Sequence, residues 1–225
     1  MSRHLQREIQ KLKKSILHIG AVVEKNLHDG VRSLQTRDAD LAREVFDVDT
    51  SIDQLEVDVE EECLKVLALH QPVANDLRFI VSVLKINNDL ERIGDLAVNI
   101  AERALFLESR DPVDCPFDFP AMARKAEDML RKSLDALVNQ DSKLAQKVRA
   151  ADDEVDALNR QMYLLVQDGI RKRPAELEPL IHLLSASRHV ERIADLATNI
   201  AEDVIYLVEG HIVRHKPTVP DSQER

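Results

Sequence analysis

The feature that most constrains this chain is a long segment that occurs twice. Residues 91–107 read ERIGDLAVNIAERALFL, and residues 191–207, 100 positions later, read ERIADLATNIAEDVIYL. In both copies the apolar residues recur at alternating steps of three and four, which is the spacing of one buried helix face. Helix packing accounts for the repeated Leu, Ile and Ala. The repeated Glu, Asp and Asn need a separate explanation, because packing does not require them.

An earlier pair of segments repeats in the same way, at an offset of 103. The apolar residues of segment 41–59 match those of segment 144–162 in number and spacing. Asp38 and Asp141 precede these segments, where a short carboxylate can accept hydrogen bonds from the free N–H groups of a first helical turn. We therefore predict a helix in each segment, with an aspartate cap at its start.

Each half of the chain is thus expected to contain three long helices. The first helices are predicted from about His4 to Gln35 and from about Pro120 to Gln140, and Pro72 and Pro174 suit the openings of the third helices. Antiparallel helices with one apolar stripe each bury those stripes against one another. We predict an all-α protein of two tandem three-helix bundles made by internal duplication, with a single six-helix bundle as the alternative.

The predicted organisation is a first repeat at 1–110, a Pro- and Asp-rich linker at 111–119, a second repeat at 120–211 and a disordered tail at 212–225.

Composition excludes several classes of function. The net charge of -10 repels phosphate backbones and there is no Trp to stack on bases, so we expect no nucleic-acid partner. No secretory signal and no apolar run of about 18 residues is present, and Cys63 and Cys115 match no metal or redox spacing, which favours a cytoplasmic protein. Lys11, Lys13 and Lys14 fit a solvated helix face better than a contact with an acidic membrane surface, so the chain is expected to be peripheral to a membrane at most.

The repeated acidic residues point away from the predicted core. In the apolar register of the third helix, Glu91, Asp95 and Asn99 fall on one outer stripe, and Asp49 and Asp53 form a second acidic pair one turn apart. Solvated surface is the ordinary role of such residues. However, like charges at this spacing destabilise a helix by a few tenths of a kcal/mol. The same pairs recur in register in the second half, at Asp152, Asp156, Glu191, Asp195 and Asn199.

A bound cation would explain this clustering, because it removes the repulsion between the carboxylates. Oxygen ligands suit hard ions such as iron, manganese, magnesium or calcium, and zinc is less favoured because the stripe holds no His or Cys. The chain has no P-loop, no G-x-S-x-G elbow, no H-E-x-x-H motif and no E-x-x-H pair, so we do not expect an enzyme. Two alternatives remain open. One is a metal-dependent phosphatase or hydrolase in which metal-bound water attacks a phosphate, and the other is a helical adaptor without metal.

These motifs together resemble the PhoU family of bacterial accessory and regulatory proteins for phosphate-specific transport. The resemblance rests on ERIGD and ERIAD followed by NIAE, on D-x-x-x-D in each middle helix and on NDLR in the first half, and it covers nearly the whole chain. It implies a fold of two helical bundles with metal clusters on the protein surface. Carried onto this chain, one cluster would comprise Asp49, Asp53, Glu91 and Asp95, the other Asp152, Asp156, Glu191 and Asp195, with Asn99 and Asn199 as supplements. The two clusters need not be equal, because Gly94 is matched by Ala194 and Glu56 by Asn159.

The resemblance also implies a function. PhoU-like proteins restrain phosphate uptake and the phosphate-starvation response when phosphate is ample. They are thought to contact the sensor histidine kinase and the ATPase of the phosphate ABC transporter at the cytoplasmic side of the membrane. We expect the same of this chain, and we also expect it to form a homodimer. Arg92 and Arg192 are expected to pair with neighbouring acids, with a phosphate or partner contact as the alternative, and Arg78 has no assigned role.

Overall fold

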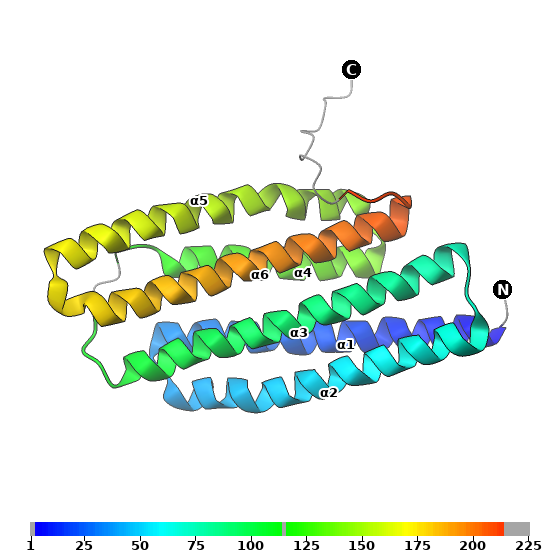
Figure 1. Ribbon diagram of the computed structural model, residues 1–225, viewed down its shortest axis with the longest axis horizontal. Coiled ribbons are helices and arrows are strands. Elements are labelled where there is room, and N and C mark those ends of the chain that lie inside the picture. The colour runs from blue at the N-terminus through cyan, green and yellow to red at the C-terminus, as the bar shows by residue number, and fades with distance from the viewer. Residues whose placement is uncertain (1–2, 114–115, 214–225) are drawn as a thin grey trace, which may run out of the picture.

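The protein is entirely helical in the part of the chain that the structure describes. The computed structural model describes residues 3–113 and 116–213 (Figure 1). Its elements are α1 (Arg3–Thr36), α2 (Ala39–His70), α3 (Ala74–Glu108), α4 (Phe119–Asn139), α5 (Ser142–Lys172), the short 3-10 helix η1 (Pro174–Glu176) and α6 (Leu177–Glu209). The predicted fold class, three long helices in each half, is confirmed.

The predicted aspartate caps are present at the starts of α2 and α5. The carboxylate of Asp38 accepts hydrogen bonds from the backbone N–H groups of Asp40 and Leu41, at 3.1 and 3.0 Å. Asp141 accepts one, from the N–H of Leu144 at 3.0 Å. These bonds satisfy donors that have no partner within the helix, so both turns into the middle helices are fixed locally.

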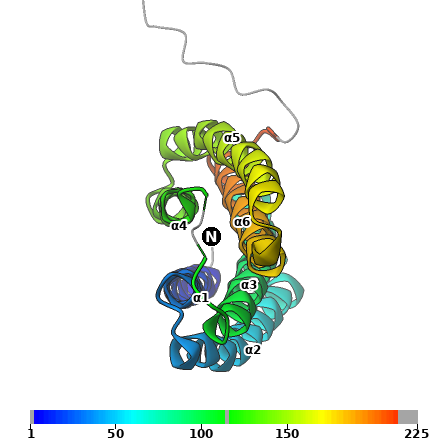
Figure 2. The same ribbon diagram turned by 90° about the vertical axis from the view of Figure 1, so that its left-hand side faces the viewer.

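The six helices run nearly parallel to the long axis of the molecule. α5, α6, α3 and α2 lie side by side as one curved layer, and α4 and α1 lie behind it (Figures 1 and 2). Within each half the three helices pack as an antiparallel bundle, and α3 also packs against α6 along its length. The duplicated units are therefore joined through their third helices.

One hydrophobic core runs through both halves. Its largest fully buried side chains include Ile16 of α1, Ile93 of α3 and Met122 of α4. Gly30 of α1 allows a close approach, because a Cβ at this position would lie 3.0 Å from the carbonyl oxygen of Ala97 on α3. Burial of these apolar faces is the main driving force for packing the helices together.

Polar and aromatic contacts also cross from one half to the other. Lys85 Nζ on α3 lies 3.1 Å from a carboxylate oxygen of Asp203 on α6. Phe106 of α3 stacks on the ring of His182 of α6, with ring centroids 3.6 Å apart. These contacts fix the position of α6 on α3 and hence the position of any site that uses both helices.

The connections differ in detail between the halves. Pro174 opens η1, just before α6, whereas Pro72 is buried in the connection two residues before α3 begins. Of the predicted tail, only residues 212–213 are described, and they lie beyond the end of α6; residues 214–225 and Cys115 lie outside the described residues. Cys63 is buried in α2. None of the described helices combines the length and the apolar character needed to cross a membrane.

Candidate functional site

The first acid cluster, which consists of Asp49, Asp53, Glu91 and Asp95, lies along the seam between α2 and α3. The two helices of this antiparallel pair each contribute two carboxylates one turn apart, and packing brings the four groups together. Burial and the nearby charges of Asp95, Asp53, Glu56 and Asp49 all raise the pKa of Glu91. The other three acids of the cluster lie close enough to Glu91 for their negative charges to raise its pKa. The structure therefore brings the four predicted residues together.

Asp49 is the most constrained member of this first acid cluster. Its Oδ1 atom is buried and has no hydrogen-bond partner among the described residues. Burial, followed by the charges of Asp53 and Asp95, raises the pKa of Asp49 to about 6. A buried carboxylate oxygen without a donor is unfavourable unless a proton or a cation satisfies it.

Gly94 makes room for this carboxylate. A Cβ at position 94 would lie 2.9 Å from Asp49 Oδ1 and 3.3 Å from Ile52 Cδ1. Real Cβ contacts are longer, so any side chain at this position must displace the carboxylate. Gly in a helix interior is unfavourable, and at position 94 it leaves space for the Asp49 carboxylate, whereas the second copy has Ala194 at the matching position.

The second acid cluster, which consists of Asp152, Asp156, Glu191 and Asp195, occupies the matching seam between α5 and α6. Burial and the charges of Asp195, Asp156 and Asp153 raise the pKa of Asp152 to about 6, and the nearby Thr198 hydroxyl opposes part of this rise. Burial and Asp156 also raise the pKa of Asp195. The second predicted set is thus also brought together by the fold.

Basic side chains moderate the second acid cluster but not the first. Arg188 and Arg192 lower the pKa of Glu191, against the rise caused by burial and by the neighbouring acids. No basic group contributes to the raised pKa of Glu91. Arg92, the counterpart of Arg192, instead lies 3.7 Å from Asp89, three residues earlier on its own helix.

The second acid cluster opens onto a polar groove between the two halves. The groove has a volume of about 610 Å³. Its lining residues are Lys85, Asn88, Asp89 and Arg92 from α3, Asp152 from α5, and Asp195, Thr198, Asn199 and Glu202 from α6. Lys85, Asn88 and Asp89 were not predicted from the sequence, and Arg92 was predicted only to pair with neighbouring acids, because only the packing of α3 against α6 places them beside the second half's acids.

The two asparagines differ in their surroundings. The side-chain amide of Asn99 donates a hydrogen bond to the backbone carbonyl of Asp95, at 2.8 Å, so its N–H is already used on its own helix. Asn199 lines the polar groove. Both lie one turn beyond the acids that they were predicted to supplement.

The repeated Glu of the NIAE motif also has two environments. Glu202 is buried, and its carboxylate accepts a hydrogen bond from Arg149 Nε at 3.1 Å. Glu102 is exposed and lies beside Arg103, the next residue along the chain. Neither role was predicted, since the motif is the same in both halves and only the neighbouring helix differs.

The acid clusters fit hard cations in donor chemistry but are not arranged as coordination shells. Within residues 3–113 and 116–213, no three His, Cys, Asp or Glu side chains form a group that could hold a metal ion as they stand. The acids of each cluster are nevertheless close enough for neighbouring charges to raise the pKa of Glu91 and of Glu191, and Asp49 and Asp152 each have a buried Oδ1 without a hydrogen-bond partner among the described residues. Oxygen donors of this kind suit Mg, Mn, Ca or iron.

The sequence of this chain is similar to those of known proteins along nearly its whole length. The sequence matches the PhoU domain over residues 16–104 and again over residues 119–204. It is 38% identical over 212 residues to the phosphate-specific transport system accessory protein PhoU homolog of Aquifex aeolicus, which covers 94% of this chain and 96% of that protein. The homolog from Pseudomonas aeruginosa is 36% identical over 221 residues, covering 96% of this chain and 89% of that protein.

Solved structures agree with these sequence matches. The crystal structure of PhoU from Pseudomonas aeruginosa superimposes with a TM-score of 0.88 at 35% identity and covers 92% of this chain and 99% of that one. The phosphate transport system regulatory protein PhoU from Streptococcus pneumoniae gives a TM-score of 0.83 at 27% identity, covering 93% of this chain and 99% of that one.

Proposed function

This chain belongs to the PhoU family, and from that premise we propose that it restrains phosphate uptake and the phosphate-starvation response when phosphate is plentiful. The proposal is supported by relatives named as accessory proteins of the phosphate-specific transport system and by a structural neighbour described as its regulatory protein. The observation that carries it onto this chain is the pair of acid clusters, repeated in register on one duplicated fold.

We propose that the regulator acts by contact rather than by turnover. Its partners would be the sensor histidine kinase and the ATPase of the phosphate ABC transporter, reached from the cytoplasm. The two repeats, residues 1–110 and 120–211, would act as one body because α3 and α6 pack together. We also expect a homodimer.

The acid clusters would hold cations that stabilise this contact surface. Asp49, Asp53, Glu91 and Asp95 would bind one, with Asn99 beside them. The second set is Asp152, Asp156, Glu191 and Asp195, with Asn199. Iron, manganese or magnesium suits these oxygen donors, and zinc suits them less. When bound, the cation supplies positive charge that cancels the repulsion within each cluster and leaves outward-facing positions for a partner's oxygen ligands.

Cation binding can be tested directly on each acid cluster. Titration of metal-stripped protein with manganese or ferric iron should show binding that is lost on Asp49→Asn with Asp95→Asn. The loss at the altered cluster should exceed about 100-fold, because even outer partners of a metal ligand are worth about 10- to 100-fold in affinity. The matched control is Asp47→Asn with Glu108→Gln, two exposed acids outside both clusters. Equal weakening by the control pair would mean that general surface charge, not the cluster, binds the cation.

The regulatory role is tested in cells. Deleting the gene should leave phosphate uptake and alkaline phosphatase expression high in phosphate-rich medium, and the intact gene should restore repression. A gene lacking the acids of both clusters should restore it only weakly, whereas the control pair should restore it fully. Normal repression in the deletion strain would refute the proposal. Turnover of a phosphorylated partner by the purified protein, lost with Glu91→Ala and Asp95→Ala, would instead favour a metal-dependent hydrolase.

A further inference from the structure

Large apolar side chains project into solvent at one end of the molecule, around the connection between α2 and α3. Val73 is 74% exposed and Leu69 is 67% exposed, and Leu77 on the first turns of α3 is also exposed. Ile212, just beyond α6, is 62% exposed. Scattered exposed apolar residues are ordinary, but here the neighbouring ends of three helices present them together.

The backbone of this connection holds Val73 outward. Pro72 is buried, so the residue after it is carried away from the core. Gln71 and Ala74 have φ values of 45° and 49°, a left-handed conformation that residues with a Cβ rarely adopt. Gln71 is the left-handed cap of α2, with its N–H bonded to the carbonyl of Leu67, and Val73 follows it in an extended conformation with its side chain exposed.

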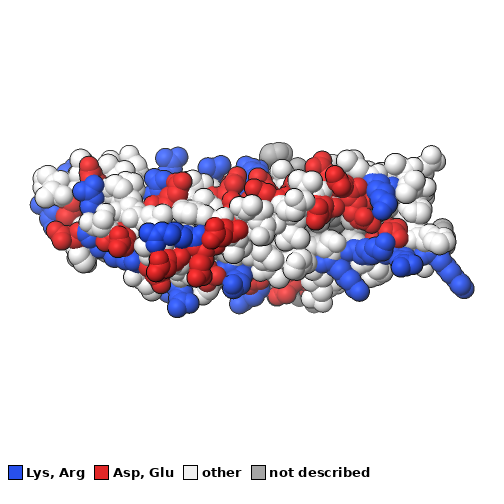
Figure 3. Space-filling view, turned by 90° about the horizontal axis from the view of Figure 1, so that it is seen from below, with Lys and Arg blue, Asp and Glu red and all other residues white. Residues whose placement is uncertain are grey.

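Basic side chains surround this apolar end. α1 begins here, beside the connection between α2 and α3 (Figure 1). Lys13 Nζ lies 5.6 Å from the ring centroid of Phe79, and Arg78 reaches Gly210 at the end of α6. Arg3 and Lys14 are exposed and form no ion pair with any described residue. Seen from below in Figure 3, Lys and Arg lie toward the end where α1 starts, with a group of Asp and Glu beside them.

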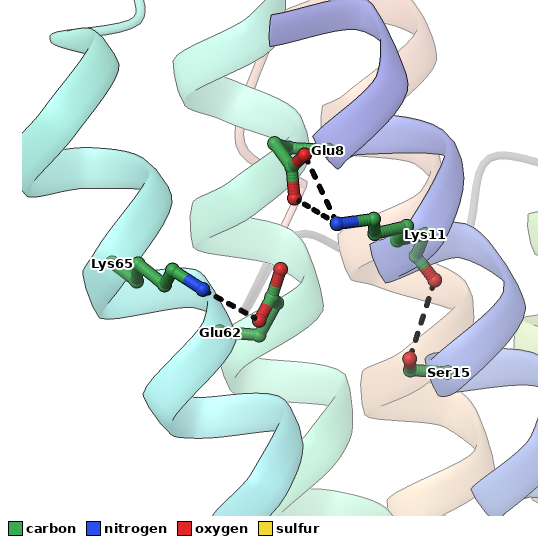
Figure 4. Close-up of polar contacts among 5 residues, drawn as sticks. All are labelled: Glu8, Lys11, Ser15, Glu62 and Lys65. Carbon is green, nitrogen blue, oxygen red and sulfur yellow. Dashed lines mark hydrogen bonds and ion pairs between the residues drawn. The ribbon is translucent and has the colours of Figure 1, made fainter. Parts of the chain in front are cut away.

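Several acids at this end already have basic partners. In Figure 4, Lys11 contacts both carboxylate oxygens of Glu8, at 3.0 and 2.8 Å, and Lys65 lies 3.9 Å from Glu62. Glu209 lies 3.4 Å from His211. Asp76, Glu60 and Glu61 also lie here with no ion pair to a described residue, against Arg3, Arg7, Lys13, Lys14 and Arg78, so the excess of positive charge lies at the start of α1. This end therefore differs from the rest of a chain whose net charge is -10.

We propose that this end, the apolar tip formed by Leu69, Val73, Leu77 and Ile212 with the basic start of α1, binds the surface of an anionic lipid bilayer. Basic side chains near an anionic surface add attraction, while the acidic remainder of the molecule is repelled and orients the tip toward the lipid. A second copy of the chain is a poorer occupant, because two basic ends would repel each other. Binding of this tip to a bilayer would require only lipid, and neither the transporter nor the kinase.

The test is flotation of the full-length protein with vesicles at low ionic strength in the presence of EDTA. The chelator removes cation bridges between the acid clusters and headgroups, so the result is independent of the proposed metal sites. We expect binding to phosphatidylglycerol-containing vesicles, little binding to phosphatidylcholine alone, and loss of binding as salt is raised. Such binding should be weak and reversible, because neither a small apolar tip nor a few basic residues anchors a protein alone.

The tip variant Leu69→Gln with Val73→Ser should bind anionic vesicles about tenfold more weakly, given the free energy of burying an aliphatic side chain. The matched control is Leu164→Gln, an exposed leucine on α5, and it should bind as the native chain does. Both variants alter exposed side chains, and equal melting temperatures will show that they fold. No binding to anionic vesicles, or equal loss in the control, would overturn the proposal. Loss of a protein partner from the tip variant without any vesicle binding would also overturn it, in favour of a protein surface.

Discussion

The two acid clusters carry the same motif in different surroundings. Around the first, Glu56 adds a fifth carboxylate and no basic group moderates the raised pKa of Glu91. Around the second, Asn159 stands where Glu56 stands in the first half, and Arg188 and Arg192 lower the pKa of Glu191. Duplication thus copied the acids while the neighbouring residues diverged. We expect the first acid cluster to bind cations more tightly.

A second difference lies in the helix positions just beyond the acid clusters. In the second half, Arg149 and Glu202 form a buried ion pair beside the groove, and Lys85 reaches across from the first half to Asp203. In the first half, Glu102 is exposed. The second acid cluster therefore lies at the junction between the halves, beside the groove.

The largest expected effect is a difference in unfolding free energy between the variants Glu202→Ala and Glu102→Ala. Glu202→Ala removes the carboxylate that accepts a hydrogen bond from Arg149, whose side chain is 7% exposed. Breaking a buried ion pair on one side costs about 3–5 kcal/mol, and an exposed pair is worth about 0–1 kcal/mol. Urea unfolding should therefore show a loss of about 3 kcal/mol for Glu202→Ala and less than about 1 kcal/mol for Glu102→Ala. Equal losses would mean that the two repeats place this residue alike.

The next effect concerns pH. The pKa of Asp49 and of Asp152 is raised to about 6 in the folded chain, above about 3.9 for an unfolded Asp. Between these values the folded state binds more protons than the unfolded state, so the metal-free protein should lose stability as the pH rises from about 4 to about 6. A cation competes with these protons, so its affinity should fall about tenfold between about pH 7 and about pH 5.

Single variants can divide this pH dependence between the acid clusters. Asp49→Asn and Asp152→Asn should each remove part of it, and both together should leave only the part that comes from the raised pKa values of Glu91, Glu191 and Asp195. The midpoints should be similar because the two groups share the same raised pKa. If Asp49→Asn alone abolishes the whole dependence, the second acid cluster is fully neutralised by its arginines and the two are more different than their burial suggests.

A third test exchanges the residue that distinguishes the two motifs. Gly94→Ala puts a Cβ 2.9 Å from Asp49 Oδ1, so the carboxylate must move and cation affinity at the first acid cluster should fall by up to about tenfold, the equivalent of about 1.4 kcal/mol. The metal-free chain should gain up to about 1 kcal/mol from the better helix former, and Ala194→Gly should lose about as much. Unchanged cation binding in Gly94→Ala would remove Asp49 from the ligand set.

Much of the fold was predictable because its signals are local. Apolar residues at steps of three and four predicted the long helices, and Asp38 and Asp141 predicted the starts of α2 and α5. The acid pairs were also local, since spacing of i and i+4 places both carboxylates on one face of a helix. Bringing Asp49 toward Glu91 needed only the packing of consecutive helices, which short connections favour.

The contacts between the halves could not be predicted in the same way. Lys85 and Asp203 are 118 residues apart in the sequence, and nothing in either segment specifies the partner. Glu202 looks identical to Glu102 within the NIAE motif, yet only Glu202 meets Arg149, whose place in the first half is taken by Phe46. Periodicity defines which face of a helix is buried, but not which distant polar side chain lies against its edge.

The smallest expected difference lies at the two caps, and it tests whether the halves are equal where no acid cluster is involved. Asp38 accepts two backbone N–H groups and Asp141 accepts one. Replacing an aspartate cap by Ala costs about 1 kcal/mol, so both Asp38→Ala and Asp141→Ala should destabilise the protein by about this amount in urea unfolding. Asp38→Ala should cost a few tenths more, because it frees a second N–H group. A larger loss for Asp141→Ala would indicate that the second half unfolds first and limits the stability of the whole chain.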